Sequence, residues 1–304
     1  MIPLLVIGGP TASGKTTLAI ELAKRLDGEI VSADSMQIYK YMNIGSAKPD
    51  EEEKEGVPHH LLDVCEPTEN FSLGDYLVLA RKAIEDIHSR GKLPVVAGGT
   101  GLYINSLINN IELTEEQDTS EIRAKLTEFA EEKGAEALFE RLREVDPESA
   151  ERIHPNNVKR VMRALEIFES TGKTMTETLK ESQKPPVYNA VQYAINHDRE
   201  VLYDRINRRV DIMIGQGLVE EVDSLVKMGC TRDNTSMQGI GYKEVLDHLE
   251  GKLTVEEMAE EIKQATRRYA KRQITWFKRN DMIWLDAGAI DFDALAEEIR
   301  SKIG

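Results

Sequence analysis

The stretch GPTASGKT, residues 9–16, matches the pattern G-x-x-x-x-G-K-[ST] of a phosphate-binding loop. It follows an apolar run at residues 2–7, which predicts a buried strand, and it precedes a helical pattern in which Leu18, Leu22 and Leu26 recur at four-residue spacing. Backbone N–H groups of such a loop, with the helix N-terminus behind them, surround phosphate oxygens. The expected ligand is therefore a diphosphate or a triphosphate.

Every position of this loop is a candidate for diphosphate binding, namely Gly9, Pro10, Thr11, Ala12, Ser13, Gly14, Lys15 and Thr16. We expect Lys15 to reach the outer phosphate and the Thr16 hydroxyl to ligate Mg²⁺, the one metal cofactor that the sequence indicates. Most loops of this kind act on the γ-phosphoryl group of a nucleotide. A kinase or an NTPase is therefore the first alternative function.

Working outward from the loop, short apolar runs alternate with helical patterns. Strands are predicted at residues 29–32, 61–65, 93–97, 190–196 and 283–285, and Leu77, Ala80, Ile84 and Ile87 mark an amphipathic helix among them. Alternation of this kind predicts an α/β fold with a P-loop-type, mainly parallel sheet flanked by helices.

A different pattern interrupts this alternation. Charge rises and strand signals vanish between residues 114 and 184, where Val158, Val161, Leu165 and Phe168 keep helical spacing, until two consecutive prolines follow. We therefore expect an α/β core domain made of residues 1–113 and 187–304, and an all-helical inserted domain at residues 114–186.

Charge and composition limit the possible partners. The formal net charge of −15 over 304 residues argues against nucleic-acid binding, yet residues 262–280 hold seven Lys and Arg residues and no acid. A solvated helix face would look similar, but so uncompensated a cluster favours a polyanion. The two cysteines predict neither a disulfide framework nor a zinc site and suit a reducing cytosol. No stretch reads as a signal peptide or a membrane span.

Several long segments, in order along the chain, resemble the tRNA dimethylallyltransferases, also called isopentenyl-tRNA transferases. They are GPTASGKT from Gly9, SADSMQIYKYMNIGSAKP from Ser32, AGGTGLYI from Ala97, KRVMRALEIF from Lys159, GIGYKE from Gly239 and YAKRQITWF from Tyr269. One departure is Ser46, where the family usually has threonine, and the hydroxyl is kept.

The resemblance implies transfer of a dimethylallyl group from dimethylallyl diphosphate to N6 of adenosine 37 in the anticodon stem-loop of tRNA, which gives N6-isopentenyladenosine and diphosphate. The phosphate loop would then hold the prenyl donor. Allylic C–O cleavage places negative charge on the departing diphosphate, and fixed donors that match this charge accelerate the step. The four expected catalytic residues are Lys15, Thr16, Asp34 and Arg209.

Two of these assignments have alternatives. Asp34 reads either as a Mg²⁺ ligand or, as the resemblance implies, as the general base that removes the proton from the adenine amine. Arg209 lies in a helical pattern whose buried face is Leu202, Ile206 and Val210, so it is either solvated or, by resemblance, directed at the diphosphate opposite the loop.

The resemblance also implies which residues contact tRNA. They are Asp34, Ser35, Met36, Gln37 and Thr100, together with Arg123, Lys159, Arg160 and Arg163 in the helical insertion. The basic helix that ends in Trp276 and Phe277 is a further candidate for the tRNA-facing surface. The alternative for Thr100 is that it belongs to a turn that merely needs glycine. For the adjacent His59 and His60 we expect structural or substrate-adjacent roles rather than metal binding.

Three functions thus compete. The first is tRNA prenylation. The second is prenylation of free adenine nucleotides by an adenylate isopentenyltransferase, against which the helical insertion and the basic helix argue. The third is a P-loop small-molecule kinase or a nucleotide-gated binding protein. We expect a cytoplasmic monomer with no membrane partner.

Overall fold

The computed structural model of this chain describes residues 1–113 and 119–303. Contacts divide it into two compact units, one made of Met1–Ile108 and Pro186–Gly304 and the other of Asn109–Pro185. The expected first residue of the insertion, Thr114, lies outside the described residues. Each unit has its own hydrophobic core.

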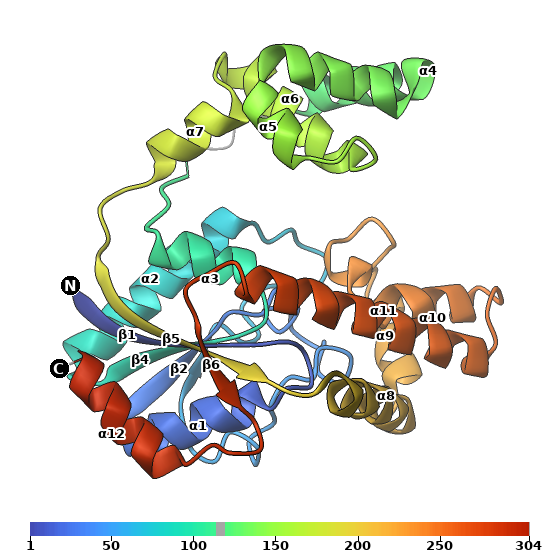
Figure 1. The fold of residues 1–304 in the computed structure, drawn as a ribbon. Helices are drawn as coiled ribbons and strands as arrows, with labels where there is room; N and C mark the ends of the chain where they lie inside the picture. The colour runs from blue at the N-terminus through green and yellow to red at the C-terminus, as the bar shows by residue number, and fades with distance from the viewer. Residues whose placement is uncertain (114–118, 304) are drawn as a thin grey trace. The chain divides into compact units, whose positions relative to one another are not determined.

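The first unit is built on one parallel sheet (Figure 1). Within the described residues its strands are β1 (Ile2–Gly8), β2 (Gly28–Ser32), β3 (His59–His60), β4 (Leu93–Ala97), β5 (Tyr188–Asn196) and β6 (Ile283–Asp286). The order is β3-β2-β4-β1-β5-β6, and every pairing is parallel. The phosphate loop therefore leaves a central strand, at the edge of the sheet where parallel strands place their ligands.

Helices cover both faces of this sheet, which explains why β1 is apolar at successive positions. Leu5 and Ile7 pack with α1 (Lys15–Arg25) and α12 (Phe292–Ile303), whereas Leu4 and Val6 pack with α2 (Leu73–Ser89) and α3 (Gly101–Ile108). The sequence-based prediction of an α/β fold with a P-loop-type parallel sheet is confirmed.

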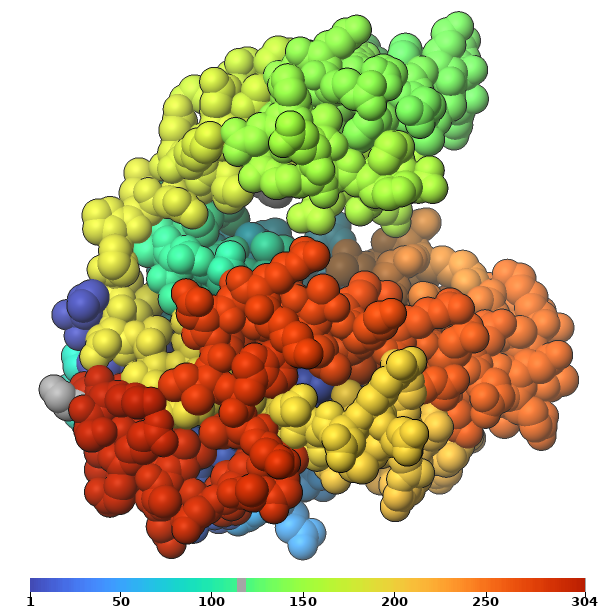
Figure 2. Space-filling view, in the orientation of Figure 1, coloured from blue at the N-terminus to red at the C-terminus, as the bar shows by residue number. Residues whose placement is uncertain are grey.

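A second layer of helices follows β5. It consists of α8 (Arg199–Gly215), α9 (Leu218–Lys227), the 3₁₀ turn η1 (Ser236–Gln238), α10 (Tyr242–Leu249) and α11 (Val255–Phe277). Figures 1 and 2 show α8 and α11 side by side on one face of this unit. The predicted buried face of α8 is confirmed, because Leu202, Ile206 and Val210 are almost fully buried.

Helices are the main regular elements among the described residues of the second unit, which also has one antiparallel bridge between Ile111 and Gln183. It contains α4 (Ser120–Val145), which is interrupted at Gly134, then α5 (Pro147–Arg152), α6 (Val158–Thr171) and α7 (Met175–Ser182). Its core joins Leu126, Leu138 and Leu142 of α4 to Val161 and Leu165 of α6. We find no apolar helix in the described parts of the chain with the length that a bilayer crossing requires.

One predicted strand, residues 61–65, is wrong. The strand beside β2 is the two-residue β3, and the chain turns immediately after it. Leu61 and Asp63 have φ values of 64° and 55°, a left-handed conformation that cannot continue a strand. Leu61 is nevertheless buried. The apolar pattern at residues 61–65 therefore indicated a buried side chain correctly, but not an extended backbone.

Candidate phosphate-binding active site

The phosphate loop has the backbone conformation that its glycines permit. Gly9 and Gly14 have φ values of 145° and 89°, and Ala12 is also left-handed at 62°. Two loop carbonyls are tied to the segment after β5, because Arg205 Nε donates to Ala12 O at 2.8 Å and His197 Nε2 lies 2.7 Å from Ser13 O. The loop is thus held in shape by side chains from the start of the helical layer.

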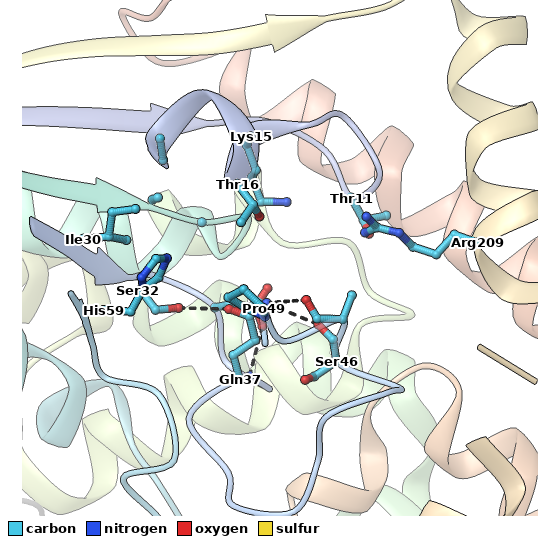
Figure 3. A pocket seen from close by; sticks show the side chains of 15 residues that line it. Thr11, Lys15, Thr16, Ile30, Ser32, Gln37, Ser46, Pro49, His59 and Arg209 are labelled. Atoms are coloured by element: carbon cyan, nitrogen blue, oxygen red, sulfur yellow. Dashed lines mark hydrogen bonds between the residues drawn. The ribbon is translucent and has the colours of Figure 1, made fainter. Parts of the chain in front are cut away.

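A pocket of about 570 Å³, including the space at its mouth, opens beside this loop. Figure 3 shows Lys15 and Thr16 on one side, Arg209 directed in from α8, and Gln37, Ser46 and Pro49 opposite. Six of the sequence-predicted site residues line it, namely Thr11, Lys15, Thr16, Asp34, Gln37 and Arg209. The other predicted loop positions and Ser35, Met36 and Thr100 are not among the lining residues.

The electrostatics of this pocket favour an anion. The pKa of Lys15 is lowered to about 8, chiefly by burial; nearby Asp34 raises this pKa, and Arg209 lowers it. Burial and the neighbouring Arg205 likewise lower the pKa of Arg209. Two cations that are costly to keep charged become stable when an anion enters between them.

Asp34 is the only carboxylate among the described residues that line the pocket. Its Oδ1 accepts the backbone N–H groups of Met36 at 2.9 Å and Gln37 at 3.4 Å, which fixes the side chain at the end of β2. Among the residues that the structure describes, no hydrogen bond engages Oδ2. The carboxylate is therefore oriented, with one oxygen available to a substrate or an ion.

The GGTG turn is joined to the Asp34 segment. Thr100 N donates to Ala33 O at 3.0 Å, and Thr100 Oγ1 accepts from Ser35 N at 3.0 Å. At Gly98 an added Cβ would lie 2.2 Å from the Ala33 carbonyl oxygen. Glycine is required here because two backbones touch, and that contact places Thr100 beside the residues around Asp34.

The wall opposite the phosphate loop is built by residues 43–49. Gln37 Nε2 donates to the carbonyls of Ser46 at 3.3 Å and Ala47 at 3.1 Å, and its Oε1 accepts from Ser32 Oγ at 3.2 Å. The Ser46 hydroxyl donates to Met42 O at 2.6 Å, a bond that the threonine usual at this position could also make. The Gln37 amide is thus engaged in holding the pocket wall.

Glu221 of α9 fixes the start of that same wall. Its two carboxylate oxygens accept three successive backbone N–H groups, from Asn43 at 2.8 Å, Ile44 at 2.7 Å and Gly45 at 3.0 Å. The Tyr242 hydroxyl donates to the same carboxylate at 2.9 Å. Such charge-assisted bonds are about twice as strong as neutral ones.

The predicted tRNA contacts in the insertion lie on α4 and α6. Arg123 and Arg163 both pair with Glu166, at 2.9 and 3.1 Å, and Glu166 is 2% exposed. Lys159 and Arg160 are exposed in the first turn of α6. The buried Glu166 thus orients two of the four predicted cations of this unit.

The basic helix α11 is only partly a free surface. Phe277 is fully buried against Gly8, so its ring is unavailable for stacking on a base, and the Trp276 ring packs on Gly101. Lys263 is paired with Asp211 at 2.7 Å. Arg268, Lys271, Arg272, Lys278 and Arg279 are exposed.

The histidines have structural partners. His59 Nδ1 lies 2.8 Å from Val57 O, and His60 Nε2 lies 2.8 Å from Glu29, whose pKa is held at about 2 chiefly by Arg90. The described residues hold no cluster of three or more metal-ligating side chains. The Thr16 hydroxyl and the Asp34 carboxylate, which line one pocket, are hard oxygen donors of the kind that Mg²⁺ takes alongside substrate phosphates.

Sequence reasoning missed Gln273, Tyr269, Glu221, Tyr242 and His197. Gln273 accepts from Thr11 N and donates to Gly99 O, both at 2.9 Å, and it is 6% exposed. Tyr269 lies beside Thr100 and Gln273. The available signal was the spacing of Tyr269, Gln273 and Trp276, which puts all three on one helical face of a segment that otherwise reads as basic surface.

Comparisons with known proteins agree with this geometry. The family model described as IPP transferase matches residues 37–280, and the one described as isopentenyl transferase matches residues 2–70. A tRNA dimethylallyltransferase of Acetivibrio thermocellus is 55% identical, with 95% of this chain and 93% of that protein aligned. One from Caldanaerobacter subterraneus is 50% identical, with 99% and 96% aligned.

Solved structures show the same likeness. The full-length tRNA isopentenylpyrophosphate transferase of Bacillus halodurans is 45% identical with a TM-score of 0.74, covering 100% of this chain and 97% of that one. A eukaryotic dimethylallyltransferase, whose structures were described as snapshots of the enzyme acting on tRNA, is 33% identical with a TM-score of 0.77, covering 94% and 74%.

Proposed function

The chain belongs to the IPP transferase family of tRNA dimethylallyltransferases, and on that premise we propose that it transfers the dimethylallyl group of dimethylallyl diphosphate to N6 of adenosine 37 in tRNA. The enzyme is a prenyltransferase, and the products are N6-isopentenyladenosine and diphosphate. The observation that carries the assignment is one pocket lined by two half-buried cations, Lys15 and Arg209, and one oriented carboxylate, Asp34.

The cation side of the pocket suits a departing diphosphate. As the allylic C–O bond breaks, negative charge grows on the diphosphate, and Lys15, Arg209 and the loop N–H groups stabilise it. Both cations are partly desolvated, so they interact more strongly with the diphosphate than they would in bulk water. Removing one preorganised donor of this kind typically costs roughly 3 to 4 kcal/mol of barrier.

The carboxylate side suits proton removal. The adenine N6 amine is a weak nucleophile, because its lone pair is delocalised, and it must lose a proton as the C–N bond forms. Asp34, held by the N–H groups of Met36 and Gln37 through one oxygen, accepts that proton on the other. Thr100, joined to Ser35, contacts the nucleotide that presents the amine.

Mg²⁺ would complete the donor end of the site, and the Thr16 hydroxyl would hold it beside the diphosphate. When bound, it neutralises part of the charge on the diphosphate and so favours its departure. Asp34 remains the alternative ligand, and the Asp34→Asn variant separates the two roles.

The proposed partner is the anticodon stem-loop of tRNA. Arg123, Lys159, Arg160 and Arg163 give the helical insertion a cluster of cations on an otherwise acidic chain, which suits phosphate contacts. A stacked adenine cannot reach the pocket, so adenosine 37 enters as a loop nucleotide turned out of the stack. We further propose that the enzyme works in the cytoplasm as a monomer.

A kinase is the alternative with a specific physical basis, because the same loop binds ATP in many enzymes. Family membership does not favour it. Prenylation of a free adenine nucleotide would leave the cations of the insertion without a use.

The test incubates the protein with radiolabelled dimethylallyl diphosphate, Mg²⁺ and unmodified tRNA, and then maps the label by nuclease digestion. We expect label on one adenosine at position 37, stoichiometric pyrophosphate, and ATP left intact when it is added. Conversion of ATP to ADP without prenyl transfer would refute the proposal. Label on free adenylate in preference to tRNA would support the second alternative instead.

A further inference from the structure

A buried glutamine joins the phosphate loop to the neighbouring GGTG turn. Gln273 Oε1 accepts from the backbone N–H of Thr11, and Gln273 Nε2 donates to the carbonyl of Gly99, each at 2.9 Å. Gln273 is 6% exposed, so water cannot readily replace either bond. An unmade bond at a buried polar group costs roughly 1 to 3 kcal/mol, and the two bonds therefore hold the two segments in one fixed relation.

The surrounding face of α11 fits the GGTG turn closely. An added Cβ at Gly99 would lie 2.3 Å from Gln273 Nε2, and one at Gly101 would lie 2.3 Å from the Trp276 ring. Tyr269, one turn before Gln273, lies beside Thr100. Three side chains of one helix face thus contact three consecutive residues of the turn, so movement of the turn must involve α11.

The two joined segments serve opposite ends of the proposed reaction. Thr11 belongs to the loop that holds the diphosphate, whereas Thr100 belongs to the turn that is bonded to Ser35, next to Asp34. Gln273 is the described side chain that bonds to the backbone of both. It touches neither reacting atom, and so it acts through the groups that it positions.

We propose that Gln273 is a positioning residue that couples the two substrate sites, so that an anion in the phosphate loop raises the affinity of the enzyme for tRNA. This inference rests on the proposed function. Bound diphosphate fixes the peptide of Thr11, Gln273 transmits that restraint to Gly99, and the nucleotide then meets a turn that is already ordered. Coupling free energies of this kind usually correspond to a change in affinity of about 5-fold to 150-fold.

The test measures the dissociation constant of unmodified tRNA with and without saturating magnesium pyrophosphate. Pyrophosphate fills only the anion site and has no prenyl group to touch the base, so the coupling must pass through the protein. We expect pyrophosphate to tighten tRNA binding by about fivefold or more in the unaltered enzyme. In Gln273→Met, which keeps side-chain length but loses both bonds, the ratio should fall to within about twofold of one.

Two further variants complete the design. Gly99→Ala keeps glutamine at position 273 but places a Cβ where the Gln273 amide lies, so it should lower the coupling in the same way. This variant tests the inference independently if Gln273→Met fails to fold. Gln264→Met makes the same chemical change at an exposed position of the same helix and should keep the full ratio. Repulsion between pyrophosphate and tRNA phosphates is equal in all variants and cancels in the comparison.

Absence of coupling in the unaltered enzyme, or full coupling in both Gln273→Met and Gly99→Ala, would overturn the inference. The proposed function is judged separately, from dimethylallyl transfer by the same unaltered preparation. Transfer without coupling would refute only the inference. Absence of transfer would refute the function, whatever the binding ratios are.

Discussion

Replacing Glu221 with glutamine should loosen the pocket wall without touching the reacting groups. The carboxylate accepts the N–H groups of Asn43, Ile44 and Gly45 and the hydroxyl of Tyr242. A glutamine whose oxygen faces Asn43 and Ile44 keeps those two bonds. Its NH₂ group then faces the N–H of Gly45, so two donors oppose each other.

The size of the effect follows from that geometry. The half-buried N–H of Gly45 loses its acceptor, the Tyr242 hydroxyl must turn to accept from the new NH₂ group, and the bonds from Asn43 and Ile44 lose the assistance of the charge. The local cost is about 2 kcal/mol. Because each 1.4 kcal/mol is a factor of ten, protection of these amides from hydrogen exchange should fall about thirtyfold. The KM for dimethylallyl diphosphate should rise, since residues 43–49 carry Ser46 and Pro49 of the pocket.

Hydrogen exchange followed by mass spectrometry over residues 43–49 measures this directly, with donor KM determined in parallel. Glu220→Gln, an exposed neighbour on the same helix, should change neither quantity. Protection in Glu221→Gln within about threefold of the unaltered protein would show that the carboxylate does not hold the loop, and the reasoning would fail.

Three other perturbations separate the remaining roles. Burial lowers the pKa of Lys15 to about 8, and anion binding needs its charged form, so pyrophosphate affinity should fall as pH rises above about 8 in calorimetric titrations. Lys15→Arg should shift that decline to higher pH, and an unchanged decline would assign it to another group. Asp34→Asn should retain pyrophosphate binding and lose about a hundredfold or more in prenyl transfer, and weakened binding with intact turnover per bound donor would favour the metal-ligand role instead. Gly98→Ala forces a Cβ against the Ala33 carbonyl and should destabilise the protein by about 2 kcal/mol or more in urea unfolding. Gly215→Ala, in open space within α8, should be neutral or slightly stabilising, and equal effects at both glycines would refute the packing argument.

Local sequence patterns predicted much of the fold and the phosphate-binding loop of the site. The loop at residues 9–16 is recognisable from its own residues, because Gly9 and Gly14 permit the positive φ angles that its turn requires. Apolar runs at residues 93–97 and 190–196 lie in β4 and β5. The run at residues 61–65 failed for a physical reason: burial of an apolar side chain does not specify the backbone angle, and Leu61 is buried in a turn.

The order of the strands was beyond such patterns. The sequence of β1 does not indicate that β4 and β5 flank it. The paired residues lie about 90 and 190 positions apart, and the backbone hydrogen bonds that join them can form with almost any side chain. That pairing brings Asp34, Lys15 and Arg209 around one pocket.

The sequence by itself therefore determined the chemistry that each segment offers. It indicated a loop that binds an anion, a carboxylate that follows a strand, and cations on helices. These properties depend on single residues and their near neighbours. Only the tertiary structure decided which of them meet. Gln273 and Glu221 read as ordinary polar helix positions until folding aligns them with backbone groups more than 170 residues away. The spacing of Tyr269, Gln273 and Trp276 indicates a shared helical face, but it does not indicate which segment that face meets, because a hydrogen bond to a backbone group does not depend on the partner's residue type.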